Sequence, residues 1–174
     1  MNKQAISISI KEKKEMLEYT VRWKNKPTGE EMMCKSFEFP RPELLEALEN
    51  CGEYIPLICG IPKDHITRII VAGATFLYTK ENKVYGVVFG VSLIMTCGRV
   101  LDLKTPEMGI RVNNPDLDKS TMWEDRLTKQ VMTLHDEIIL YAEGRRGQTS
   151  LNFEEGEINE ICKENGAESG EESE

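Results

Sequence analysis

Residues 121–144, TMWEDRLTKQVMTLHDEIILYAEG, contain the clearest structural signal in the chain. Thr121 and Glu124 have the T-x-x-E spacing of a capping box, which marks a helix N-terminus. Apolar residues then recur every three or four positions, as on one face of an amphipathic helix; they are Trp123, Leu127, Val131, Leu134, Ile138 and Tyr141. Gly144 follows the last of these residues and indicates the C-terminal end of the helix. The pattern predicts a helix over 121–143, roughly 33 Å long at about 1.5 Å per residue, enough to cross a sheet.

The rest of the chain is mostly patterned for strands. Apolar and polar residues alternate over 6–10 and 17–23, which predicts a hairpin, and 31–39 predicts a third strand with Met33, Phe37 and Phe39 on one side. Residues 65–79 and 83–104 are rich in Val, Ile and Tyr and predict a meander. Its glycines indicate bulges or close backbone approach. Residues 42–51 change to helical spacing behind Pro42, and 104–116 reads as a loop.

These elements predict an α+β fold with a mainly antiparallel sheet, one short helix and one long C-terminal helix. The length of 174 residues suits one domain. We place that domain at 1–153 and a disordered tail at 154–174. No apolar run approaches the roughly 18 residues of a membrane span, and the N-terminus does not read as a signal peptide. Five cysteines without a C-x-x-C pair indicate reduced thiols and a cytosolic protein.

The net charge of −8 is concentrated at the C-terminus. Residues 152–174 hold nine glutamates and one lysine, whereas residues 1–151 hold equal numbers of acidic and basic residues. Such a segment cannot bury enough apolar surface to offset the entropy of ordering it, so we expect disorder. Three roles remain open at this point: a competitor for the body's basic surface, a handle for partner proteins, or a solubility tail with no specific role.

The sequence offers no catalytic constellation. His135 lies within the long helix, but Ile139 occupies the position at i+4 where a second metal ligand would be needed. Surface or packing roles suit both His135 and His65. The glycines lack phosphate-loop spacing, and Cys97 has no identifiable base beside it. We therefore expect a protein that is not an enzyme, with no catalytic residue, no metal and no cofactor.

Binding is better supported, because basic residues and aromatic residues mix in the N-terminal hairpin. Cations that follow phosphates and rings that stack on bases can together hold single-stranded nucleic acid. The candidate nucleic-acid-binding residues are Lys11, Lys13, Lys14, Arg22, Trp23, Lys24 and Lys26, with Arg145 and Arg146 as a second basic spot. Strict alternation favours another interpretation, in which Trp23 and Tyr19 face the core and the lysines face solvent.

The long apolar stripe also raises the possibility of self-association. Its N-terminal part, Trp123, Leu127 and Val131, is the tentative interface of a homo-oligomer. The alternative is that the whole stripe packs within its own monomer.

Three segments resemble a family of uncharacterised phage and prophage proteins of Gram-positive bacteria. They are PRPELLEALENCGEYI (40–55), GVSLIMTCGRVLDLKTPEM (90–108) and LHDEIILYAEGRRGQTSLNF (134–153), the last with a Y-x-x-G-[KR]-x-x-Q helix end. No activity or site residue comes with the resemblance. It implies a small virus-encoded protein in the cytoplasm of a bacterial host. We therefore expect an accessory protein of viral DNA replication or recombination that binds single-stranded nucleic acid or a replication protein. The alternative is a counter-defence protein that binds a host immune enzyme or sequesters a nucleotide signal.

Overall fold

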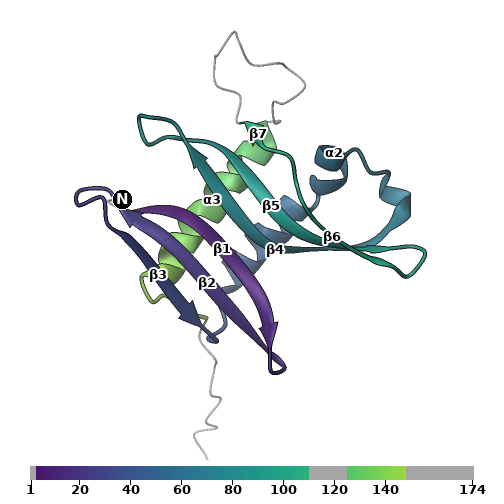
Figure 1. Cartoon of the computed structure of the whole chain (residues 1–174), viewed down its shortest axis with the longest axis horizontal. Coiled ribbons are helices and arrows are strands. Elements are labelled where there is room, and N and C mark those ends of the chain that lie inside the picture. Colours follow the sequence, from purple (N-terminus) through teal and green to yellow (C-terminus); the bar gives the residue numbers. More distant parts are fainter. Residues whose placement is uncertain (1–2, 110–124, 148–174) are drawn as a thin grey trace, which may run out of the picture.

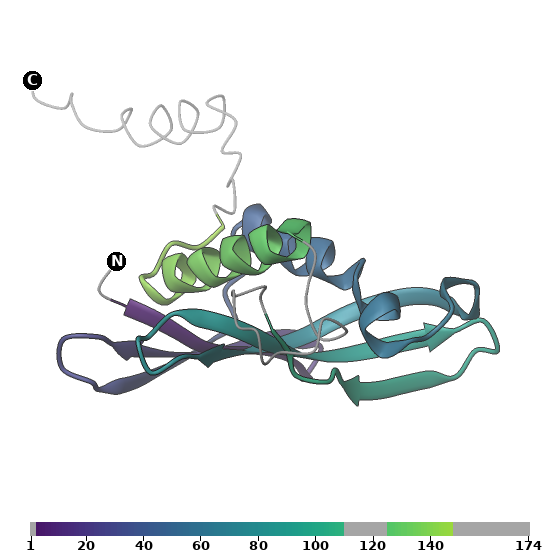
Figure 2. The ribbon, with the colours of Figure 1, turned by 90° about the horizontal axis from the view of Figure 1, so that it is seen from above.

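The structure, a computed structural model, describes residues 3–109 and 125–147. It is an α+β fold in two layers, with an antiparallel sheet on one side and helices on the other (Figures 1 and 2). The strands are β1 (Lys3–Lys13), β2 (Met16–Asn25), β3 (Glu31–Ser36), β4 (Ile66–Tyr78), β5 (Val84–Met95), β6 (Val100–Lys104) and β7 (Met108–Gly109). The helices are α1 (Pro42–Gly52), α2 (Ile55–Cys59) and α3 (Asp125–Ala142), with a 3₁₀ turn at Lys63–His65.

The sheet has the strand order β3-β2-β1-β4-β5-β6, and β7 pairs with the end of β5. Neighbours in sequence form hairpins, but β1 and β4 meet only after the chain has passed through both α1 and α2. Register shifts in β1 near Ile6 and in β4 near Ala72 mark bulges. Gly73 follows the second bulge, where an added Cβ would lie 2.7 Å from the carbonyl oxygen of Ile8. The bulge expected from the glycines of this segment is therefore confirmed.

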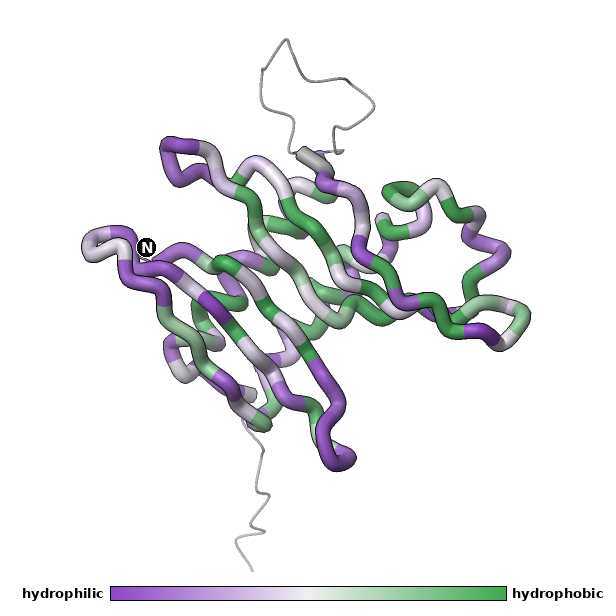
Figure 3. The backbone as a smooth tube through the Cα atoms, in the orientation of Figure 1, coloured by the Kyte–Doolittle hydropathy of each residue, from purple (hydrophilic) through white to green (hydrophobic). Residues whose placement is uncertain are grey.

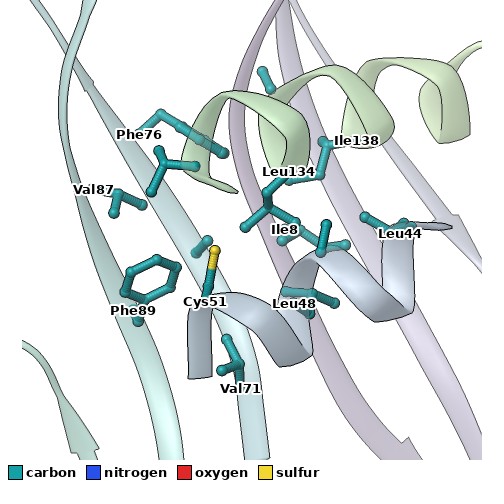
Figure 4. Packing of buried hydrophobic residues seen from close by; sticks show 14 of the residues in the cluster. Ile8, Leu44, Leu48, Cys51, Val71, Phe76, Val87, Phe89, Leu134 and Ile138 are labelled. Carbon is teal, nitrogen blue, oxygen red and sulfur yellow. The ribbon is translucent and has the colours of Figure 1, made fainter. Parts of the chain in front are cut away.

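Helices α1 and α3 pack on the same face of the sheet, where they enclose the core (Figure 4). Leu44, Leu48 and Cys51 come from α1, and Leu134 and Ile138 from α3; all are buried. They meet alternate residues of the strands, including Ile8, Val71, Phe76, Val87 and Phe89. The predicted helix at 42–51 and the predicted cover of the sheet by the two helices are thus confirmed. Gly144, with a φ of 86°, follows the end of α3 as expected.

Some predicted boundaries differ from the structure. The third strand ends at Ser36, so Phe37 and Phe39 lie beyond it and are exposed. The short helix α2 was not expected; Pro56 near its N-terminus and five residues of length give no periodic pattern to detect. Met108–Gly109, in the predicted loop, adds β7. The capping box at Thr121 and the tail at 154–174 lie outside the described residues.

The second face of the sheet carries no described element (Figure 2). We call it the open face. Its turns are hydrophilic, while the central strands β4 and β5 are the most hydrophobic part of the sheet (Figure 3). In the described residues, no helix is both long and apolar enough to cross a membrane.

Candidate nucleic-acid interface

One cross-strand row on the open face runs through the six strands from β3 to β6. Residues paired across antiparallel strands point to the same side, and the registers join Lys35, Thr20, Ser9, Gly73, Gly90 and Lys104 in this order. At roughly 4.8 Å per strand the row is about 24 Å long. Its middle positions are glycine or carry a hydroxyl, and a lysine stands at each end.

The middle of this row is the floor of a groove of about 1000 Å³. The groove runs over β1, β4, β5 and β6, between Lys11 on one side and Lys104 and Glu107 on the other. Gly73 is required by the close approach of β1, but Gly90 is not: a Cβ added to Gly90 would meet nothing within 4 Å. At Gly90 the floor of the groove is therefore formed by backbone without a side chain above it, and a ligand can approach this backbone from solvent.

Basic residues outnumber acidic residues on the open face. Seven cations lie on it by strand register: Lys11, Lys13, Arg22, Lys24, Lys35, Arg68 and Lys104. Four carboxylates accompany them: Glu18, Glu31, Asp102 and, at the margin, Glu107.

Among the residues that the structure describes, only two of the seven cations have an ionic partner. Lys13 pairs with Glu18 at 3.2 Å and Arg22 with Glu31 at 3.0 Å. Asp102 instead accepts a hydrogen bond from the hydroxyl of Ser92. Within the described part of the chain, the other five cations form no ion pair, so they remain available to an anion.

The helix layer has the opposite charge. Between them α1 and α3 carry six acidic residues, Glu43, Glu46, Glu49, Asp125, Asp136 and Glu137, against two basic ones, Arg126 and Lys129. The body of the protein, neutral in total, is thus polarised between its two faces. A polyanion is attracted to the open face and repelled from the helices.

The structure removes Trp23 from the predicted interface. Trp23 is 7% exposed and Tyr19 is 1% exposed, because both point from β2 toward the helices. The alternation of the hairpin places rings and cations on opposite sides, so the rings cannot stack on bases held at the open face. The interpretation that Trp23 and Tyr19 belong to the core is the one that the burial supports.

The remaining predicted cations do not form one patch. Lys11 and Lys13 lie near the β1–β2 turn that contains Lys14, whereas Lys24 and Lys26 lie at the opposite end of β2. Lys35, Arg68 and Lys104, which complete the open face, were missed. In the sequence these residues are recognisable as polar positions of alternating segments. Which face of the sheet they share can be known only from the order of the strands.

Arg146 performs a structural role on the helix side. Its Nε donates to Glu38 at 2.9 Å, and its guanidinium lies 3.6 Å from the centre of the Tyr141 ring. The Tyr141 hydroxyl donates to the Glu38 carbonyl at 2.8 Å. These contacts hold the end of α3 against the segment after β3. Arg145, next in sequence to Arg146, is exposed.

Two of the three predicted interface residues lie within the monomer's own core. Leu127 is 2% exposed and Val131 is fully buried. They leave no surface there for a second copy. Trp123 lies outside the described residues.

His135 is buried against β1 and β4. The Ala5 amide donates to its Nε2 at 3.4 Å, and its Nδ1 lies 2.9 Å from an Asp136 carboxylate oxygen. The ring also meets Phe76 edge-on. These contacts are those of the packing role that the sequence favoured. Cys97 lies exposed in the β5–β6 turn. Of the residues that the structure describes, no three His, Cys, Asp or Glu side chains are grouped to hold a metal ion.

Comparison of the chain with family models, with curated proteins and with solved structures finds no match. The open face is therefore interpreted from its own geometry and charge.

Proposed function

We propose that the protein binds single-stranded nucleic acid along the open face of its sheet, as a virus-encoded accessory protein of DNA replication or recombination. The observation that carries the proposal is the polarised charge: cations outnumber carboxylates on the open face, whereas the helices on the covered side are acidic. The resemblance to phage proteins supplies the biological context.

The chemistry of the open face makes such binding electrostatic. Among the described residues that strand register places on this face none is aromatic, so the stacking energy of about 1–3 kcal/mol per base is missing there. Affinity must come from cations that displace counterions from phosphates. Five open-face cations have no ionic partner among the described residues. If each contacts one phosphate, the logarithm of affinity falls against the logarithm of salt concentration with a slope of about −3.5.

The test is a salt titration of fluorescence polarisation with a labelled oligothymidylate. Lys104→Glu and Lys11→Glu each remove a cation from the groove, so each should weaken binding and reduce the slope by about 0.7. Lys129→Glu is the matched control, because it makes the same charge change on the exposed side of α3. Equal losses from Lys129→Glu and Lys104→Glu would show that net charge, not the open face, determines binding.

A second candidate rests on the groove floor. A site of about 1000 Å³ over paired glycines and hydroxyls matches the size of small-molecule pockets, and the lysines beside it suit a phosphate. This arrangement favours sequestration of a nucleotide signal, as in counter-defence. A rise in melting temperature with a small nucleotide, in a protein indifferent to oligothymidylate, would favour this candidate over the first.

A further inference from the structure

We infer that the open face is the docking surface for the chain's own glutamate-rich segment, residues 154–174. This segment carries nine glutamates and one lysine, a net charge of −8. The five open-face cations that form no ion pair within residues 3–109 and 125–147 offer it the complementary charge. The acidic helix layer repels it, so the polarised body selects one face for docking.

The contacts at the end of α3 determine where this segment leaves the body. The Gly147 amide donates to the Phe39 carbonyl at 3.0 Å, and Arg146 and Pro40 form a β-bridge. An added Cβ at Gly147 would lie 2.8 Å from the Pro40 carbonyl oxygen, so the two backbones are in close contact. The chain is thereby held beside the C-terminal end of β3, three residues beyond Ser36.

Gly147, where the described chain ends, lies at the same end of the sheet as two of the open-face cations, Lys35 and Lys11. Ser36 pairs with Tyr19, which pairs with Ile10, so Lys35 and Lys11 are adjacent in register to this end. Two strand spacings, about 10 Å, separate β3 from β1. Five spacings, about 24 Å, separate β3 from Lys104 on β6.

The chain beyond Gly147 is long enough for these distances. Glu154 is the seventh residue after Gly147, so the fully extended chain between them reaches up to about 25 Å. The 27 residues from 148 to 174, treated as a flexible chain, have a root-mean-square length of about 26–31 Å. The whole width of the open face is within that length, so the tether supplies an effective concentration in the millimolar range.

The direct test uses Cys162, which lies within the segment. Cys34, Cys59 and Cys97 are changed to serine, the buried Cys51 is kept, and a nitroxide is attached to Cys162 of the full chain. Docking broadens the amide signals of the open-face strands and spares those of α1, and added salt abolishes the effect. Broadening that is uniform, or strongest over the helices, would overturn the inference.

A charge-neutralised chain makes the test specific. Replacing all nine glutamates of 154–174 by glutamine preserves the length and should remove the selective broadening. The control is Glu46→Gln with Glu49→Gln and Glu53→Gln, which removes three negative charges from the helix side but keeps the open-face cations and the acidic segment, so the broadening over the open-face strands should persist. Persistence of broadening in the neutralised tail would refute a charge-driven contact.

The regulatory consequence rests on the proposed function. If the segment competes with nucleic acid, the neutralised tail should bind oligothymidylate about tenfold or more tightly at low salt, with a gain that shrinks as salt rises. The two ideas fail separately. Selective broadening in the full chain, with a neutralised-tail variant that still ignores oligothymidylate at low salt, refutes the proposed function and leaves the docking intact. If neutralising the tail does not change oligothymidylate binding, and the open-face amide signals are not selectively broadened, the docking alone is refuted.

Discussion

Removing the hydroxyl of Tyr78 should destabilise the protein, because it leaves one buried backbone carbonyl, that of Ala5, without its hydrogen-bond donor. The β1–β4 ladder covers Ser7 to Ser9, and the bulge at Ile6 leaves Ala5 beyond its end. Ala5 is fully buried, so its polar groups cannot reach water. The Tyr78 hydroxyl donates to the Ala5 carbonyl, and the Ala5 amide donates to His135. Two side chains thus replace the missing strand partners.

Tyr78→Phe keeps the ring and its edge-on contact with His135, whose centroid lies 6.4 Å away, and deletes only the donor. A buried acceptor left without a partner costs about 1–3 kcal/mol. For a chain of this size that is a fall of about 2–12 °C in melting temperature. Because both side chains act on Ala5, a second change at His135 should couple to the first by about 0.5 kcal/mol or more.

The assay is thermal unfolding followed by circular dichroism, with Tyr85→Phe as the control. Tyr85 lies on the neighbouring strand β5, and its hydroxyl has no hydrogen-bond partner in the described part of the chain. Tyr85→Phe should therefore leave the melting temperature almost unchanged. Equal melting temperatures for the two variants would refute the argument, since the Tyr78 bond would then contribute nothing beyond the packing of its ring.

Three further outcomes can be checked by simple measurements. Gly73→Ala should lower the melting temperature, since its Cβ would lie 2.7 Å from a backbone oxygen, whereas Gly90→Ala, its cross-strand partner with free space, should be nearly neutral. Burial raises the pKa of the Cys51 thiol to about 12, so Cys51 should react with a thiol reagent only on unfolding, unlike the exposed Cys97. Burial, and then the charge of Asp136, raise the pKa of Tyr78 above 10.0. Below pH 10 both the folded and the unfolded chain keep the phenolic proton, so Tyr78 should not make the free energy of unfolding depend on pH. Above pH 10 the unfolded chain loses this proton first, so the free energy of unfolding should fall as pH rises, and Tyr78→Phe should make that fall less steep.

The fold was largely predictable because its strongest signals are local. The stripe on α3, the Pro42 helix start and the alternation of the N-terminal hairpin each need only a few neighbouring residues. The elements that were missed are those with little local pattern, such as the five residues of α2. Phe37 and Phe39 continue the alternation of the third strand, yet the chain leaves the sheet at Ser36 to reach α1.

The candidate site was less predictable because strand order creates it. Lys104 and Lys35 stand at the ends of one row, although they are far apart in sequence and come from opposite edges of the sheet. Bringing them to one face depends on β1 pairing with β4, a contact between segments separated by α1 and α2. No local pattern encodes that pairing. Counting charges along the chain gave a neutral body and concealed its polarisation.

The arrangement of charge and aromatic residues limits what the open face can recognise. With Trp23 and Tyr19 turned into the core, the face offers cations and hydroxyls that can contact phosphates, but no ring to select a base. Phosphate contacts position a strand and carry no sequence information. Under the proposed function, binding is then weak, insensitive to sequence and strongly dependent on salt. Such binding is also the kind that a tethered run of glutamates can displace, because both ligands draw on the same few cations. A face with stacked bases would resist that competition, so the lack of an aromatic ring at the described strand positions of the open face would make it responsive to its own acidic segment.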